Sequence, residues 1–296
     1  MKKTESPYLI DAIVLAVAIL ICVPLRLLQY NGGIEANTGF YIGFGPKFIV
    51  FYAVLIAAFI FFIVSSVLKR KNIHFDTVQA KRPGLGIISL LTGFSVMYSA
   101  YITYANRGNN ALTSNYVVSP NIPAAALILM EILALVSVIY FILLGVSYLS
   151  GKSTGANFRL LSLIPVLWNV MRLIVRFTTT ISYMRVSDLM LDMIAFATYT
   201  LFFMTFAQAN AQVSEEGYEV KLPASAFFGA LLGFILFIPR IVLVITGRDD
   251  IFFILSYADP SDMMFGLFMA VTVLTRIAKG PKTERIEEAP AEEPAE

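Results

Sequence analysis

The chain has few of the residues that carry most enzyme and metal chemistry, and few charges of either sign. Its 296 residues include one cysteine, one histidine and one tryptophan, and only 14% are Asp, Glu, Lys or Arg. The single cysteine, Cys22, excludes an intrachain disulfide, and the single histidine, His74, excludes a multi-histidine metal site. Soluble domains carry about a quarter charged residues, so this deficit indicates a protein embedded in lipid.

The sequence also lacks the motifs of the common enzyme classes. It has no Gly-x-Ser-x-Gly, no Walker loop and no histidine placed for a Ser, His and Asp set. An intramembrane aspartyl protease would need two aspartates on facing helices, whereas Asp188 and Asp192 fall in one apolar segment. We therefore lean towards a protein that is not an enzyme, and we expect no metal and no cofactor. The small net charge of +2 gives no reason to expect nucleic acid as a partner.

Long apolar runs, by contrast, are abundant, and 58% of the residues are hydrophobic. A membrane helix needs about 20 mostly apolar residues. The first run is too long for a signal peptide and no small-residue cleavage site follows it, so we expect it to be retained. The sequence predicts an all-α, polytopic integral membrane bundle of about eight transmembrane helices, forming one domain over 1–279 with a disordered acidic tail at 280–296. The expected spans are 9–29, 47–68, 84–104, 122–149, 160–180, 187–209, 224–246 and 262–279.

The lysines and arginines between the expected spans set the orientation. With the N-terminus inside, 14 of the 22 Lys and Arg residues lie on the cytoplasmic side, 4 lie outside and 4 lie within spans. Basic residues are enriched in cytoplasmic loops, so both termini are expected in the cytoplasm. The expected location is the plasma membrane of a prokaryotic cell.

The fifth expected span carries an unusual polar stripe. Arg172 and Arg176 lie within it, and its non-apolar positions follow one another at steps of three or four residues, which places them on one helical face. A charge near the bilayer centre costs about 2.5–3.5 kcal/mol on insertion scales. The stripe must therefore face other helices or water. Its members are Ser162, Pro165, Asn169, Arg172, Arg176 and Thr179.

Spacing also predicts a partner for one of these arginines. The turn between the fifth and sixth spans is centred near Met184, with Arg176 eight residues before it and Asp192 eight residues after it. In an antiparallel helix pair the two residues lie at the same depth. We predict a structural ion pair between Arg176 and Asp192, and we expect Asp188, nearer the helix end, to be solvated.

The other intramembrane charges fall in the same outer layer. At 1.5 Å per residue, most of them lie about 9–15 Å below the outer surface, with Arg26 somewhat shallower. Four arginines then face two carboxylates, Glu131 and Asp192, which leaves about two surplus positive charges. The acidic stretch at 247–262 is expected to lie at the outer interface. The predicted substrate-binding residues are Arg26, Arg172, Arg240, Glu131, Asn169, Ser95 and Ser99.

This surplus favours an outward-facing, Arg-lined cavity for a carboxylate- or phosphate-bearing anion, as in a small-anion transporter or receptor. The alternative is a non-catalytic membrane scaffold or assembly partner, in which the same Arg, Glu and Asp residues form a structural salt-bridge network. A lipid-modifying membrane enzyme is a third possibility. Expected partners are membrane lipids and an anionic small molecule. Two small-xxx-small faces, Ser225–Gly229–Gly233 and Gly266–Ala270, offer surfaces for a homo-oligomer.

The predicted threading can be tested by cysteine labelling in intact cells. In a Cys22→Ala background, a membrane-impermeant maleimide should label Glu35→Cys and Asn110→Cys, because both positions lie in expected outer loops. Gly155→Cys should react only after the cells are lysed. Labelling of position 155 from outside would reverse the topology.

Overall fold

The computed structural model describes residues 7–32, 43, 45–75, 81–105, 124–151, 160–178, 186–211, 217–247 and 258–279. Within these residues the fold is a bundle of eight α-helices, which confirms the predicted all-α class. The expected acidic tail, 280–296, lies outside the described residues. The helices are α1 (Leu9–Tyr30), α2 (Pro46–Lys69), α3 (Pro83–Ala105), α4 (Ala124–Ser150), α6 (Ile164–Thr178), α7 (Val186–Ala211), α8 (Tyr218–Ile245) and α10 (Pro260–Arg276).

The helix pattern is that of a multi-pass membrane bundle. Six helices, namely α1, α2, α3, α4, α7 and α8, are long and apolar enough to cross a bilayer. Their outward faces carry large apolar side chains, such as Leu20 and Leu68, about three quarters exposed. Soluble proteins rarely expose contiguous apolar surface on this scale, whereas a lipid-facing helix requires it. The two shorter helices are α6 with 15 residues and α10 with 17.

Both shorter helices depart from their predicted boundaries. The fifth span was expected from residue 160, but α6 begins at Ile164 after a turn at Ser162 and Leu163. Pro165 explains this, because its ring would clash with the carbonyl four residues earlier and is tolerated only in the first turn. Pro165 thus lies in the first turn of α6. Pro24 and Pro239, by comparison, lie inside continuous helices.

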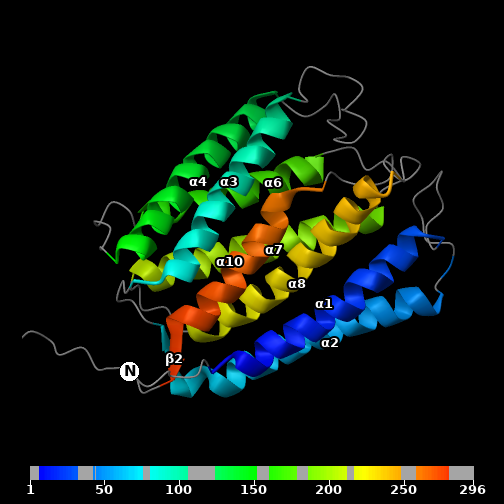
Figure 1. The fold of residues 1–296 in the computed structure, drawn as a ribbon, viewed down its shortest axis with the longest axis horizontal. Helices are drawn as coiled ribbons and strands as arrows, with labels where there is room; N and C mark the ends of the chain where they lie inside the picture. Colours follow the sequence, from blue (N-terminus) through cyan, green and yellow to red (C-terminus); the bar gives the residue numbers. More distant parts are fainter. Residues whose placement is uncertain are drawn as a thin grey trace, which may run out of the picture.

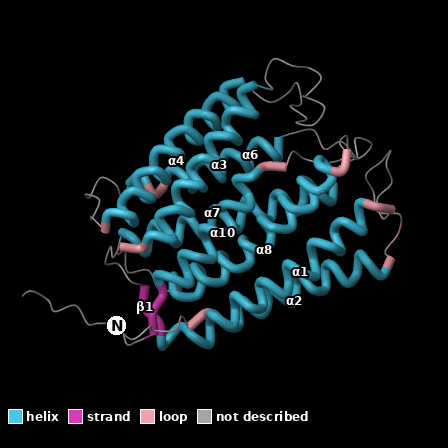
Figure 2. Tube along the Cα trace, in the orientation of Figure 1, coloured by secondary structure: helices cyan, strands magenta, loops and turns pink. Residues whose placement is uncertain are grey.

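The last helix ends earlier than predicted because the chain changes to a strand. β2 (Ile277–Lys279) pairs antiparallel with β1 (Ile73–Phe75), which follows the short 3-10 helix η1 (Arg70–Asn72) at the end of α2. The purely helical expectation missed this pair of three-residue strands. It joins the ends of α2 and α10 at the end of the bundle where α1 begins (Figures 1 and 2).

The central helix of the bundle is α8, which contacts α1, α2, α7 and α10. The α1–α2 hairpin packs along one side of it, and the α3–α4 hairpin lies across the bundle, where it meets α10 and α6 (Figure 1). Below the polar residues described next, aromatic rings fill the space between α4, α7 and α10. This aromatic cluster consists of Phe141, Phe202, Phe203, Phe206, Phe265 and Phe268.

Glycines let α8 and α10 approach closely. A Cβ at Gly233 would lie 2.3 Å from the carbonyl oxygen of Asp262, and one at Gly266 would lie 3.0 Å from the Cα of Ala230. These are the small-residue faces that the sequence offered for self-association, and here they pack against each other within one chain. This close packing holds the N-terminal turn of α10 against α8.

A substitution at Gly233 tests this packing. Gly233→Ala should destabilise the protein by about 1–3 kcal/mol, because the new methyl group overlaps the backbone of α10. Gly84→Ala is the matched control: it lies in the first turn of α3 with nothing within 4 Å, so it should be neutral or slightly stabilising. Thermal unfolding in detergent measures both. Equal stability of the two variants would contradict the close approach.

Candidate functional site: a buried layer of arginine and aspartate

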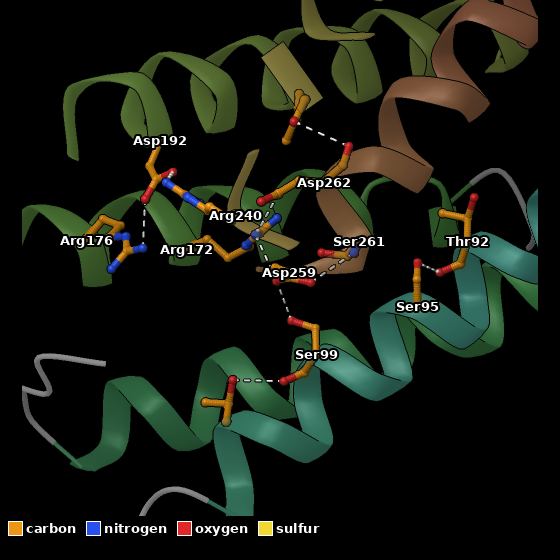
Figure 3. Close-up of polar contacts among 12 residues, drawn as sticks. Thr92, Ser95, Ser99, Arg172, Arg176, Asp192, Arg240, Asp259, Ser261 and Asp262 are labelled. Carbon is orange, nitrogen blue, oxygen red and sulfur yellow. Dashed lines mark hydrogen bonds and ion pairs between the residues drawn. The ribbon is translucent and has the colours of Figure 1, made fainter. Parts of the chain in front are cut away.

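The polar stripe of α6 faces the interior of the bundle. Asn169 is fully buried and Arg172 is 8% exposed, whereas Leu167 and Phe177 on the other face are 48% and 71% exposed. A helix that turns its charges inward and its leucines outward is suited to a lipid surrounding. The stripe therefore meets neighbouring helices, and its partners are drawn in Figure 3.

Asp192 of α7 lies between two arginines. The Arg176 Nη2 group donates to Asp192 Oδ2 over 2.7 Å, and the Arg240 Nη2 group of α8 donates to Asp192 Oδ1 over 2.8 Å (Figure 3). The Arg176–Asp192 contact agrees with the pair predicted from their spacing. Arg240 was assigned to the substrate instead, because sequence spacing gives no relation between α7 and α8. One carboxylate thus joins α6, α7 and α8.

Arg26 of α1 is held by Asp188 of α7. The Arg26 Nη2 group donates to Asp188 Oδ1, and the Tyr30 hydroxyl donates to the same oxygen over 2.8 Å. The Arg26 Nη1 group also donates to Gln29 Oε1 over 2.8 Å, and the guanidinium lies over the Tyr30 ring. Asp188 is 1% exposed, so the expectation that it is solvated is wrong. Asp188 lies at the start of α7, where its contacts with Arg26 and Tyr30 of α1 shield it from solvent.

Arg172 bonds two aspartates at the start of α10. Its Nη2 group donates to Asp262 Oδ1 over 2.9 Å and to Asp259 Oδ2 over 3.2 Å (Figure 3). Its guanidinium also lies 4.0 Å from the centre of the Phe196 ring. Glu131, a predicted substrate-binding residue, is a half-buried residue of α4, and the carboxylates that bond Arg172 are those of Asp259 and Asp262.

The sequence Asp259–Pro260–Ser261 starts α10 inside the bundle. Asp259 is the N-cap: its Oδ1 accepts from the backbone N–H of Ser261 over 2.9 Å, and Pro260 occupies the first helical position. From α3, the Ser99 hydroxyl donates to Asp259 Oδ2 over 2.7 Å. Among the predicted hydroxyls, Ser99 thus reaches the layer, while Ser95 donates to the carbonyl of Thr92 within its own helix.

Several buried polar atoms around Arg172 have no hydrogen-bond partner among the described residues. They are Nη1 of Arg172, Oδ1 of Asn169 and the hydroxyl of Ser261, whose side chain is fully buried in the first turn of α10. Asn169 uses only its Nδ2 group, which donates to the Pro165 carbonyl over 2.8 Å. Buried polar atoms are nearly always satisfied, so a group of unsatisfied ones is a candidate site for a ligand or water.

The charges of this layer balance among the described residues. Each of the four arginines bonds an aspartate, and the four aspartates number as many as the arginines, so the predicted surplus of positive charge is wrong. Sequence reasoning missed Asp259 and Asp262 because they fall in a polar stretch that resembles an outer loop. The Asp–Pro–Ser signature of a helix start was the signal that could have found them. The layer consists of Arg26, Arg172, Arg176, Arg240, Asp188, Asp192, Asp259 and Asp262.

No known protein family, curated protein or solved structure matches the chain. Within the described ranges, no group of three or more His, Cys, Asp or Glu side chains is placed to hold a metal ion.

The shared carboxylate of Asp192 makes a specific prediction. Asp192→Asn should cost about 3–5 kcal/mol, because it leaves Arg176 and the 3%-exposed Arg240 without their charge partner. Arg176→Gln should cost less, because Arg176 is 20% exposed and can reach water. The double variant should cost clearly less than the sum of the two, as measured by denaturant unfolding in detergent. Strict additivity would mean that the two side chains do not interact.

Proposed function

We propose that this chain binds a small anion carrying a carboxylate or phosphate group and moves it across the membrane, and that Arg172 holds the anion at the N-terminal end of α10. The observation that carries the proposal is that only one of the two terminal nitrogens of Arg172 has hydrogen-bond partners among the described residues. Arginine usually grips one carboxylate with two parallel N–H groups. Here a single nitrogen, Nη2, serves both Asp259 and Asp262, while Nη1 is buried and has no partner among the described residues.

The helix start beside Arg172 supports an anion at this point. The N-terminal end of a helix carries a partial positive charge and backbone N–H groups that favour negatively charged groups. The unpartnered hydroxyl of Ser261 lies in the same first turn and can donate to an anionic oxygen. Membrane transporters commonly bind substrate where a short or broken helix begins inside the bundle, and α10 has this form.

In this proposal Asp259 and Asp262 act as internal ligands that occupy Arg172 when no anion is bound. An incoming carboxylate or phosphate displaces them and takes both nitrogens of the guanidinium fork. Arg26 and Arg240, which the sequence assigned to the substrate, instead belong to the supporting framework, because Asp188 and Asp192 hold them. Arg176 remains a structural residue, as predicted from its spacing to Asp192.

One observation favours a second candidate function, the non-catalytic scaffold. The equal number of arginines and aspartates in the described layer is what a purely structural network needs, and such a network fixes the order of α1, α6, α7, α8 and α10. The two candidates differ in what they require of Arg172 Nη1 and Ser261. A ligand site requires both groups to bind the anion, whereas a purely structural network gives them no role.

A thermal-shift experiment in detergent separates the two. Acetate, methanesulfonate, phosphate and a short-chain phosphatidic acid should be titrated separately, so that free anions and lipid headgroups are distinguished. A bound anion should stabilise the wild type by about 2.7 kcal/mol at a hundredfold excess over its Kd. Arg172→Lys keeps the charge and loses the fork, so it should weaken the response about tenfold or more.

Ser261→Ala should keep or raise stability without anion, because it removes an unsatisfied buried hydroxyl, and should weaken the anion response about tenfold. Thr272→Val is the matched control, since Thr272 also has a buried hydroxyl without a partner but lies about three turns further along α10. It should leave the response unchanged. A wild type that responds to none of the four anions would favour the scaffold.

A further inference from the structure

The buried layer has no spare positive charge to receive an anion. Among the described residues its four arginines are matched by four aspartates, and seven of these eight side chains are 8% exposed or less. An added monoanion would therefore leave one uncompensated negative charge in a buried site. Burying an unpaired charge is strongly unfavourable, so a positive charge must enter with the anion.

The groups around the N-terminal end of α10 limit what that positive charge can be. Arg172 of α6 contacts both Asp259 and Asp262, and the Tyr199 hydroxyl of α7 lies 3.5 Å from the Asp262 carbonyl oxygen. The arginines are permanently protonated and cannot take up a further charge.

More distant groups do not supply it either. Arg240 of α8 and Asp192 of α7 act on Asp262 from further away, and they already neutralise part of each other. From α3 the neutral hydroxyl of Ser99 faces Asp259. The two carboxylates at the start of α10 are thus the groups in this part of the site that can change charge by accepting a proton.

We infer that the anion binds together with one proton, which is taken up by the Asp259–Asp262 pair. This inference rests on the proposed function and specifies its energetics. When an anion binds the Arg172 guanidinium, Nη2 can no longer donate hydrogen bonds to both aspartates. A proton from solvent forms an O–H bond on one of them, and the stranded carboxylate becomes a neutral carboxylic acid.

The contacts of Asp259 are suited to the protonated form. Its Oδ2 already faces the Ser99 hydroxyl at 2.7 Å, and a hydroxyl both donates and accepts. If Asp259 carries the proton, its O–H can donate to Ser99 and the contact is kept with the direction reversed. Because two interacting carboxylates titrate as a unit, we assign the proton to the pair and not to either residue. The total charge of the layer is then the same before and after binding.

Proton uptake makes the apparent affinity for anions depend on pH. Acetate and methanesulfonate keep a constant charge between about pH 6 and pH 8.5, so any change in their Kd reports on the protein. Where both aspartates are ionised, the Kd of the purified wild-type protein for either probe should rise about tenfold per pH unit. In weakly buffered solution, a pH dye should record one proton taken up per acetate bound.

Asp262→Asn and Asp259→Asn provide the decisive comparison. Each keeps one carboxylate for Arg172 and leaves the layer with one surplus positive charge, so acetate should bind without a proton. Their Kd should not vary with pH, and at high pH they should bind more tightly than the wild type. Asp11→Asn is the control, because it neutralises an equally buried aspartate at the other end of α1. It should keep the wild-type slope.

The outcomes separate this inference from the proposed function. A wild-type protein that binds acetate or methanesulfonate with a Kd independent of pH, and without proton uptake, would overturn proton coupling and leave anion binding intact. Failure to bind any anion at any pH would remove the proposed function itself. A slope that persists in both Asn variants would place the proton elsewhere and overturn the assignment to α10.

Discussion

An arginine at bilayer depth requires a carboxylate partner, because lipid cannot solvate its charge and its proton cannot readily leave. This requirement organises most of the described fold. Asp188, Asp192, Asp259 and Asp262 meet arginines from α1, α6 and α8, and the aspartates come from α7 and the start of α10. Hydrophobic burial cannot fix the order of helices whose lipid and protein surroundings are equally apolar. Directional ion pairs can, because they form only when the arginine of one helix lies beside the aspartate of another.

The two ends of the bundle use different chemistry. The end away from the strand pair holds the arginines and aspartates, whereas the part nearer the strand pair is filled by the aromatic cluster between α4, α7 and α10. Polar groups return at the end with the strand pair, where Lys69 bonds Asp11, and Arg276 bonds Tyr148 and Asn210. The polar layer is therefore separated from this end by tightly packed rings. A substrate path through the protein would have to open this aromatic cluster.

Local pattern predicted the parts of this structure that depend on one helix or one turn. The apolar runs predicted all eight helices, with boundaries that differ from the observed ones by up to six residues, and the stripe on α6 faces inward as its period requires. Arg176 and Asp192 meet, as their equal distance from the middle of the segment between the two spans predicted. The sequence pattern could not predict contacts between elements that are distant in sequence. Nothing in the chain relates Arg240 to Asp192, or Arg26 to Asp188, before α1, α7 and α8 are packed together.

The largest error concerned the start of α10. Depth was counted from the assumption that each helix begins at a membrane surface, so Asp259 and Asp262 were assigned to the outer interface. In the structure α10 begins inside the bundle, and these two aspartates neutralise Arg172. Counting charges without them produced a false surplus. A short helix preceded by acidic residues should therefore be read as a possible internal start when nearby spans carry unpaired arginines.

The strand pair anchors the C-terminal end of α10. β2 extends directly from its last residue and pairs with β1, while Arg82 donates to the carbonyl of Thr275 and Arg276 bonds two neighbouring helices. All these restraints act at one end of a rod about 25 Å long. A tilt of α10 by about 5° around this anchored end barely moves the strands, yet it displaces the opposite end of the helix by about 2 Å. That end carries Asp259 and Asp262 and packs against Gly233 of α8, so a rotation that drew both carboxylates away from Arg172 would also have to open this close contact.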